Sequence, residues 1–509
     1  MGIKRYYAKK DNTISNAFKE NLITRATGSN MGASDILEVF SIYGQASSTS
    51  TEEARILIKF DCTASTDSIK ADRDAGVIPA SGNVNFYLRL YNAPHSQTLP
   101  KSYTMDVSAV SGSWNEGTGL DMEGYRDIGN SNWVNRIASR SAGDHAWSST
   151  GGDYFSDASS SFTASFDNGT EDIELDITPL VEQWLSSSNL GQKEDEGVGI
   201  FLSNEYSSAS RSYYTKRFFA RGTEFFYKQP NIEARWDSSI EDDRGNFYYS
   251  SSLATAAENL NTIYFYNYFR GRLRNIPDIG TGSIGVSIYS SSAGSPVATS
   301  SISLVADGTH VLSSNQKVVT GSFVSTGIYS ASFAMTAAST PLTKVHDVWF
   351  KLDNAAANAS FGVQYGTGSI EPKIITNMYN APTNDYVVAI TNLREKYRPD
   401  ETARFRVYSR QKDWTPTIYT KAVSTPEVQI VESGSFEVFR VIDDLKVIPH
   451  GTGSTPYYTF LSYDTSGSYF DLDMALFEPG YVNGIRLAFY NEDIGSWVEQ
   501  SEIFKFRVE

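Results

Sequence analysis

The sequence predicts an all-β protein with three β-sandwich domains in a row. Three observations lead to this fold class: apolar and polar residues alternate with period two along much of the chain, aromatic residues make up 13% of it, and helical periodicity is scarce. Aromatic residues favour the pleated, half-buried surface of a strand, and one apolar face per strand is typical of antiparallel sheets. A length of 509 residues is compatible with two to four domains.

The clearest predicted strand covers residues 84–91, where Val84, Phe86, Leu88 and Leu90 share one face. We expect that face to lie in a core. The same alternation recurs in further segments, which are residues 55–61, 329–335, 404–408, 485–489 and 504–508. Loops rich in Gly, Ser, Asn and Asp separate these segments, as expected for sandwiches.

One short helix is predicted over residues 178–185. Thr178 is the expected N-cap, Pro179 lies in the first turn, and Gly191 follows the end. Apolar residues fall at helical spacing, so the helix should cover one end of a sheet and Trp184 should fill the core.

Two composition changes divide the chain. Residues 229–236 are typical of a last strand, and a charged, strand-poor connector follows from residue 237. A second break lies near residues 365–376. The predicted domains are therefore residues 1–236, 237–375 and 376–509.

Charge and composition exclude several classes of function. The chain has 43 Lys and Arg against 59 Asp and Glu, a net charge of −16, so we expect no nucleic-acid partner. The basic N-terminus lacks the apolar stretch of a signal peptide, and no apolar run is long enough to predict membrane insertion. Cys62 is the single cysteine, which excludes an internal disulfide, and five dispersed histidines disfavour a zinc site or a histidine-dependent enzyme.

No sequence motif predicts a catalytic site or a cofactor. Residues 280–285 have the glycine spacing of a dinucleotide fingerprint, but the residues that follow, 286–289, are typical of a strand instead of the required helix, so we interpret the segment as a turn. Acidic clusters such as residues 171–176 are compatible with a glycosidase pair or with a calcium site. No loop has diagnostic spacing, so no metal ligand is assigned.

Exposed aromatic residues give one candidate contact surface. Arg211, Tyr213 and Tyr214 are predicted to contact a glycan or a subunit interface, because sugar rings and guanidinium groups both stack on flat side chains. The alternative is that such residues alternate between a core and a subunit contact.

A basic segment, interpreted as one Arg-rich strand over residues 394–410, gives a second candidate surface. Its cations are predicted to dock onto an acidic neighbouring subunit; they are Arg394, Lys396, Arg398, Arg404, Arg406 and Arg410. The alternative is a solvated strand face.

An ordered set of motifs in the first domain resembles the DNRLRE domain, a jelly-roll sandwich related to carbohydrate-binding modules. The motifs are residues 11–14, 28–32, 55–61, 88–91, 113–118 (Ser-Trp-Asn-Glu-Gly-Thr), 175–184 and 197–202. The resemblance implies an N-terminal jelly roll. It covers less than half of the chain.

The remaining residues, 237–509, resemble the immunoglobulin-like sandwiches of bacteriophage tail, baseplate and fibre proteins. Family members with a DNRLRE domain are typically exported, whereas particles released by lysis need no export signal. The whole chain therefore resembles a bacteriophage virion structural protein. We expect a non-enzymatic protein of the neck, tail or baseplate, located in the virion, which forms a homo-oligomer in a symmetric assembly with other virion proteins. Host surface polysaccharide is a further candidate partner. The alternatives are a carbohydrate-binding adhesin and a polysaccharide-degrading enzyme.

Overall fold

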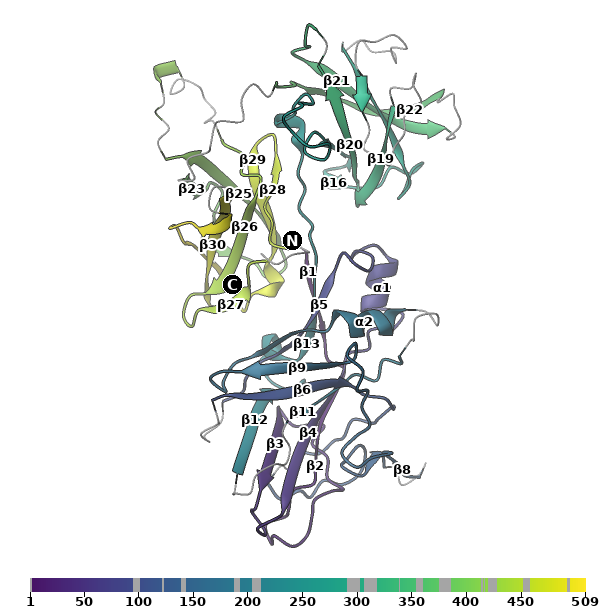
Figure 1. The fold of residues 1–509 in the computed structure, drawn as a ribbon, viewed down its shortest axis with the longest axis vertical. Helices are drawn as coiled ribbons and strands as arrows, with labels where there is room; N and C mark the ends of the chain where they lie inside the picture. The colour runs from purple at the N-terminus through teal and green to yellow at the C-terminus, as the bar shows by residue number, and fades with distance from the viewer. Residues whose placement is uncertain are drawn as a thin grey trace. The chain divides into compact units, whose positions relative to one another are not determined.

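The structure, a computed structural model, confirms the all-β fold class: strands dominate and helices are few and short (Figure 1). It describes residues 2–94, 101–120, 123–138, 143–186, 193–203, 212–290, 303–305, 318–337, 339–353, 360–374, 386–412, 415, 417–419, 428–451, 458–491 and 495–509. Within these residues no helix is both long enough and apolar enough to cross a membrane.

The chain divides into two compact units. One unit contains Gly2–Asp237 together with Tyr458, and the other contains the chain from Ser238 onward apart from the short segment that ends at Tyr458. The predicted boundary between residues 375 and 376 falls outside the described residues.

Two antiparallel sheets form the first unit. The four-stranded sheet has the order β1 (Ile3–Tyr7), β13 (Asn231–Arg235), β5 (Asn85–Leu90) and β10 (Ile173–Asp176). The seven-stranded sheet has the order β12 (Ser212–Phe219), β3 (Ile36–Tyr43), β4 (Thr51–Lys59), β11 (Val198–Leu202), β6 (Tyr103–Ala109) and β9 (Ser161–Phe166), with β2 (Lys10–Ser15) paired to β4. A small separate pair is formed by β7 (Asn135–Ile137) and β8 (His145–Ala146).

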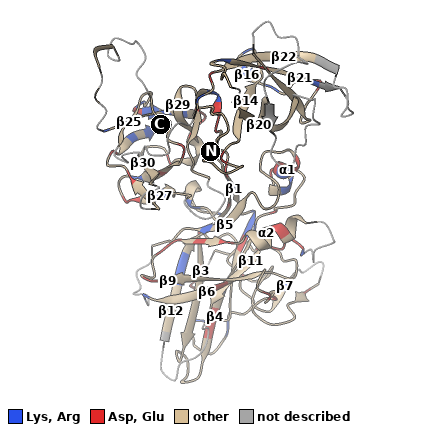
Figure 2. Cartoon of the chain, turned by 45° about the horizontal axis from the view of Figure 1, so that its top comes forward, with Lys and Arg blue, Asp and Glu red and all other residues tan. Residues whose placement is uncertain are grey.

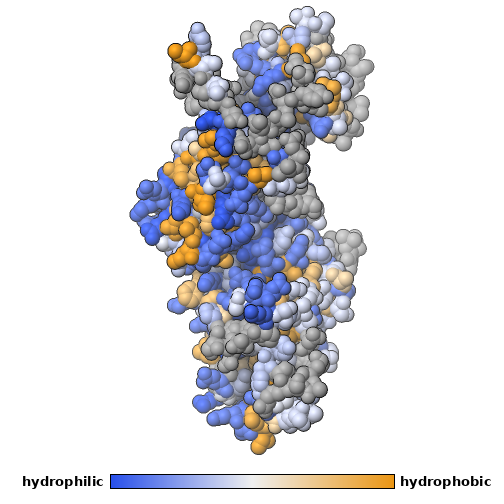
Figure 3. All heavy atoms as spheres, turned by 60° about the vertical axis from the view of Figure 1, so that its left-hand side comes forward, coloured by the Kyte–Doolittle hydropathy of each residue, from blue (hydrophilic) through white to orange (hydrophobic). Residues whose placement is uncertain are grey.

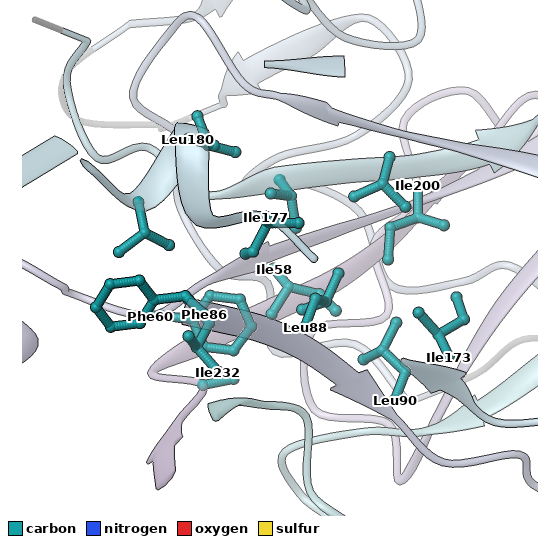
Figure 4. Packing of buried hydrophobic residues seen from close by; sticks show 14 of the residues in the cluster. Ile58, Phe60, Phe86, Leu88, Leu90, Ile173, Ile177, Leu180, Ile200 and Ile232 are labelled. Atoms are coloured by element: carbon teal, nitrogen blue, oxygen red, sulfur yellow. The ribbon is translucent and has the colours of Figure 1, made fainter. Parts of the chain in front are cut away.

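The main core of this unit contains the predicted apolar faces (Figure 4). Val84, Phe86, Leu88 and Leu90 are all fully buried, which confirms the face predicted for residues 84–91. Each large apolar side chain buried in this way stabilises the fold by about 1.5–3 kcal/mol. Alternating burial along β5 thus supplies one side of the core.

Two short helices, α1 (Ile69–Asp74) and α2 (Thr178–Leu185), complete the unit. The span of α2 and the burial of Trp184 were both predicted correctly. The predicted N-cap was wrong: Ile177 occupies that position and makes no side-chain cap. The Thr178 hydroxyl instead accepts a hydrogen bond from the backbone N–H of Phe86 at 2.8 Å, so it ties the helix to β5.

One curled sheet dominates the chain between residues 261 and 370. Its order is β14 (Asn261–Tyr266), β20 (Ile328–Thr336), β19 (Val318–Ser325), β17 (Ile284–Tyr289), β21 (Val345–Asp353) and β22 (Ser360–Ile370), with β18 (Ser303–Val305) paired to β20. The rings of Phe265 on β14 and Trp349 on β21 stack at 5.4 Å, so distant strands of the sheet face each other across a core. A turn with Gly280 at φ +60° leads into strand β17, which confirms that residues 280–285 are not a dinucleotide loop.

Two further sheets build the C-terminal sandwich. One has the order β23 (Tyr386–Ile390), β25 (Thr402–Gln411), β29 (Gly467–Asp473) and β28 (Ser462–Asp464). The other has the order β24 (Lys396–Tyr397), β32 (Phe504–Val508), β30 (Val482–Asn491), β26 (Gly434–Arg440) and β27 (Leu445–Ile448), with β31 (Ser496–Glu499) paired to β30. Phe436 of β26 stacks on Phe470 of β29 with ring centroids 4.3 Å apart, so aromatic side chains join the two layers.

Three single-turn helices lie between strands: η1 (Phe226–Lys228), η2 (Asp243–Gly245) and η3 (Met474–Leu476). The middle one positions Arg244, whose guanidinium makes two hydrogen bonds, of 2.6 and 2.8 Å, to the carboxylate of Asp347. Asp347 is fully buried on β21 and also accepts a hydrogen bond from the Trp349 indole. A side chain at Gly368 would meet Arg244 at 2.2 Å, so this glycine leaves the space for the guanidinium.

Replacement of Arg244 by Ala is expected to destabilise the second unit by about 3–5 kcal/mol, because it leaves the buried Asp347 carboxylate without its cation. Chemical denaturation of the full chain measures the loss. Arg398→Ala is the control: Arg398 and Asp400 form an exposed pair, whose loss should cost at most about 1 kcal/mol. Equal losses of stability in both variants would show that the buried Arg244–Asp347 pair contributes no more than an exposed ion pair.

Candidate functional site

The Arg-rich segment over residues 394–410 is not one strand, as predicted, but two strands in different sheets, β24 and β25. Pro399 and Asp400 lie in a turn between them, and proline cannot donate the hydrogen bond that a continuous strand requires. The prediction failed because the spacing of the cations was used without regard to this turn.

Most cations of this segment already have carboxylate partners in the same chain. Figure 2 shows how basic and acidic positions are distributed along the strands. The pairs are Arg394–Glu401, Lys396–Glu509, Arg398–Asp400, Arg404–Asp471 and Arg406–Asp464, with N–O distances of 2.6–2.9 Å. Arg410 donates to the backbone oxygen of Gln411. Docking onto an acidic subunit would therefore require these cations to exchange their partners.

The predicted aromatic contact lies on the edge strand β12. Arg211 is outside the described residues. Tyr213 is 49% exposed and Tyr214 is 37% exposed. Successive residues of a strand point to opposite faces, so the two rings do not form one flat platform, and at most one of them faces any given sugar ring.

A hairpin that the sequence interpretation missed presents a different surface. It consists of β15 (Tyr268–Phe269), a turn at Arg270 and Gly271, and β16 (Arg272–Leu273). Both turn residues have positive φ, +50° and +76°, as in the two-residue turns that match strand twist. We call residues 267–274 the basic hairpin.

The basic hairpin is anchored at its base. The backbone N–H of Arg274 donates to the Asn267 oxygen at 3.0 Å, and the backbone N–H of Asn267 donates to the Gly327 oxygen at 2.8 Å. In addition, the side-chain amide of Asn267 donates to the Arg274 oxygen at 2.6 Å. The tip is therefore held in one conformation before any partner binds.

The side chains of the basic hairpin are exposed and uncompensated in charge. Tyr268 is 61% exposed and Phe269 is 53% exposed. The guanidinium groups of Arg270 and Arg274 lie over the Phe269 ring, at 5.3 and 5.7 Å from its centroid. Across the described ranges, no carboxylate forms an ion pair with either arginine or with Arg272. The sequence signal was three arginines within residues 270–274 of an acidic chain.

Three of the motifs shared with the DNRLRE domain meet at one place in the first unit. The backbone N–H of Asp11 donates to Glu116 at 2.9 Å, and the backbone N–H of Met31 donates to the Asn12 amide oxygen at 2.8 Å. A Cβ at Gly117 would lie 1.9 Å from the Asn30 side chain, so the loops pack without space for another atom. These motif residues therefore serve loop packing, not solvent-exposed chemistry.

The same junction contains two carboxylates, the buried Asp11 and the partly exposed Glu116. Glu116 accepts three hydrogen bonds from the Arg221 guanidinium, at 2.9, 3.0 and 3.2 Å. Burial raises the pKa of Asp11 to about 7, and the nearby Glu116 charge adds to the rise, while hydrogen bonding from the Arg221 backbone and the Arg221 charge oppose it. Asp11 is only 1% exposed, whereas the Glu116 side chain is 23% exposed. The two carboxylates therefore do not face a sugar substrate together.

Other groups with catalytic chemistry are also enclosed. The Ser435 hydroxyl lies 3.2 Å from Nδ1 of His450 and 2.8 Å from the Thr459 hydroxyl, but Ser435 is fully buried. Among the residues that the structure describes, no three His, Cys, Asp or Glu side chains are grouped to hold a metal ion. The Ser435 hydroxyl is therefore not accessible to a substrate.

Substitution of Gly117 by Ala is expected to destabilise the first unit by about 1–3 kcal/mol, because the added carbon overlaps Asn30. Thermal unfolding of the full chain checks this. Gly28→Ala is the matched control in the neighbouring motif, since nothing lies within 4 Å of its added carbon. A Gly117→Ala variant that unfolds at the same temperature as the natural chain would contradict the close packing of the junction.

The raised Asp11 pKa predicts a pH-dependent loss of stability. A carboxyl with a folded pKa near 7 and an ordinary value of 3.8 binds more protons in the folded state, so its contribution is complete below about pH 4 and is lost as the pH rises through 7. Asp11→Asn should therefore be more stable than the natural chain at pH 8 and similar to it at pH 4, as measured by urea unfolding at both values. Asp74→Asn on α1, an exposed site, should leave the dependence of stability on pH unchanged. The prediction would be refuted if the stability of Asp11→Asn changed with pH in the same way as that of the natural chain.

Comparisons with known proteins give no family. No protein-family model matches the chain, and no curated protein matches it. Among solved structures it is similar to the tandem Ig repeats of Dlar, with 12% identity over 41% of this chain and 82% of that chain and a TM-score of 0.13. It is also similar to trypsin-activated alpha-2-macroglobulin from Escherichia coli, with 8% identity over 89% of this chain and 24% of that chain and a TM-score of 0.14. TM-scores this low do not establish a shared fold.

Proposed function

We propose that this chain is a non-catalytic structural protein of a bacteriophage particle, from the neck, tail or baseplate, and that it assembles with other particle proteins. The observation that carries the proposal is the basic hairpin, an exposed tip whose arginines form no ion pair with any described residue, in a chain whose net charge is −16. The DNRLRE-like motifs and the repeated β-sandwich architecture support a scaffold of this kind.

The composition of the basic hairpin is that of a protein-binding hot spot. Tyr and Arg are enriched among the residues that contribute most to protein interfaces, and Phe, Tyr and Arg are enriched in interface cores. A preorganised tip also loses little conformational entropy on binding. An acidic surface on a neighbouring protein would complement the three arginines.

The surface of the chain is mixed in hydropathy. On the face drawn in Figure 3, hydrophobic residues lie in separate patches among hydrophilic ones. A few exposed anchors in a polar surround are typical of assembly contacts that form between folded subunits. This supports docking of preformed units.

A carbohydrate-binding adhesin is the second candidate. The exposure of Tyr213 and Tyr214 favours it, because either ring is available to stack on a sugar. Their placement on opposite faces of β12 makes a shared platform unavailable, so we rank this function below assembly. A polysaccharide-degrading enzyme has less support, since the Asp11 carboxyl beside Glu116 is buried.

Charge reversal at the basic hairpin tests the assembly role. Virus encoding Arg270→Glu, Arg272→Glu and Arg274→Glu together should yield particles with about tenfold less of this chain, because unlike charges at the contact become like charges. The amount is measured by quantitative mass spectrometry of purified particles. The matched control reverses Arg394, Lys396 and Arg398, which already have internal partners, and should be incorporated normally.

Each other outcome has a definite meaning. Absence of the natural chain from purified particles would overturn the assembly function. Normal incorporation of the hairpin variant would overturn the contact. Saturable binding of the natural chain to a glycan array, lost in Tyr213→Ala, would favour the adhesin.

A further inference from the structure

The side chain of Lys216 is enclosed in the first unit beside the side-chain amide of Asn92. Lys216 lies on β12 and is fully buried, and Asn92 follows β5. The Lys216 amine donates to the Asn92 amide oxygen at 2.7 Å, although the two residues are 124 positions apart in the sequence. A buried lysine opposite a primary amide is an uncommon pairing, since lysine is rarely fully buried unless a carboxylate pairs with it.

The surroundings hold the amine in one orientation. The backbone oxygens of Gly169 and Glu171 accept hydrogen bonds from it at 3.0 and 2.8 Å. The rings of Phe166 and Phe218 lie 4.9 and 5.2 Å from the amine and exclude water. If the amine is neutral, its two N–H bonds point at the two backbone oxygens, and its lone pair is left facing Asn92.

Burial shifts both Lys216 and Asp172 toward the protonation states that a reaction needs. Burial lowers the pKa of Lys216 to about 8, against the opposing effect of the Asp172 and Glu171 charges. Burial raises the pKa of Asp172, whose carboxylate accepts a 2.7 Å hydrogen bond from the backbone N–H of Asn92. A desolvated lysine is a nucleophile. Asp172 is hydrogen-bonded to the Asn92 backbone and its charge acts on Lys216, so it is the candidate general acid.

We propose that Lys216 and Asn92 form an intramolecular isopeptide bond. The lone pair on Nζ of Lys216 attacks Cγ of Asn92, and the Nζ–Cγ bond forms. The Cγ–Nδ2 bond then breaks, and a proton moves from Nζ to Nδ2 by way of the Asp172 carboxyl. One molecule of ammonia leaves, so the reaction needs no oxidant, reductant or other reactant.

The distance is compatible with this step. A carbonyl bond is about 1.23 Å long, so the Asn92 carbon lies no farther than about 3.9 Å from Nζ. Reacting atoms in productive complexes are about 3–3.5 Å apart, so a small displacement of Nζ toward Cγ brings the two atoms within that range.

The bond would join β12 of the seven-stranded sheet to the segment that follows β5 of the four-stranded sheet, where Asn92 already forms a bridge with Phe218. The chain has one cysteine, the buried Cys62, so it has no disulfide with which to make such a link. A covalent link between distant positions restricts the unfolded chain in the same way as a disulfide does. The inference concerns the first unit alone and does not depend on the proposed function.

Mass spectrometry of the full chain tests the bond. The natural protein should be lighter than its sequence by one ammonia, and a tryptic digest should contain a branched peptide that joins the segments around Lys216 and Asn92. The branched peptide is decisive, since ring closure at an asparagine also releases ammonia. Folded natural protein at full sequence mass, or without the branched peptide, after prolonged incubation at neutral pH would overturn the proposal.

Variants separate the roles of the three residues. Lys216→Arg and Asp172→Asn should each have the full mass of their sequence, whereas Asn92→Asp should lose one water in place of ammonia. Lys59→Arg is the control: Lys59 pairs with Glu196, so this variant should keep the branched peptide. Retention of the branched peptide in Asp172→Asn would show that Asp172 does not move the proton, while its retention in Lys216→Arg would refute the assignment of the bond. If Lys216→Arg fails to fold, the natural protein and the Asn92→Asp product still decide the question.

Discussion

The need to pair every buried polar group governs how this chain holds its long loops in place. A backbone or side-chain polar atom that leaves water without a partner costs more than most single contacts contribute. With one cysteine, the chain has no disulfide to fix its loops. In the first unit, Asn12, Asn30 and Glu116 take that role by hydrogen bonding to loop backbone or to a neighbouring side chain. In the second unit, the buried Asp347 does so through Arg244.

Ion pairing within the chain also explains the role of the charged residues. A net charge of −16 suggests a surface that repels anions, yet many of the cations are ion-paired within the chain. In the segment of residues 394–410 the pairing is nearly complete. The basic hairpin is different, because among the described residues its arginines contact only an aromatic ring. The basic hairpin is therefore a positive surface because its arginines form no ion pair with the described residues. The segment of residues 394–410 contains more cations, but most of them are paired.

The fold could be predicted from the sequence more completely than the candidate sites. Period-two alternation correctly gave the buried face of Val84–Leu90, and helical spacing correctly gave α2, because both signals are local. The N-cap was mispredicted because Thr178 is hydrogen-bonded to a strand far away in the sequence. The Arg-rich segment was misinterpreted because ion pairs are set by tertiary neighbours. For the same reason nothing local in the sequence marked Lys216, whose partner lies 124 positions away.

The backbone of the hairpin turn shows what its tip is selected for. Arg270 has a φ of +50°, a left-handed conformation that costs an ordinary residue roughly 1–2 kcal/mol. Asparagine or glycine fits the first position of such a turn with little penalty. Selection for folding alone would therefore favour either of those residues. An arginine at this position lowers local stability but places a guanidinium at the outermost point of the loop. Such a loss of stability is typical of residues that serve a function.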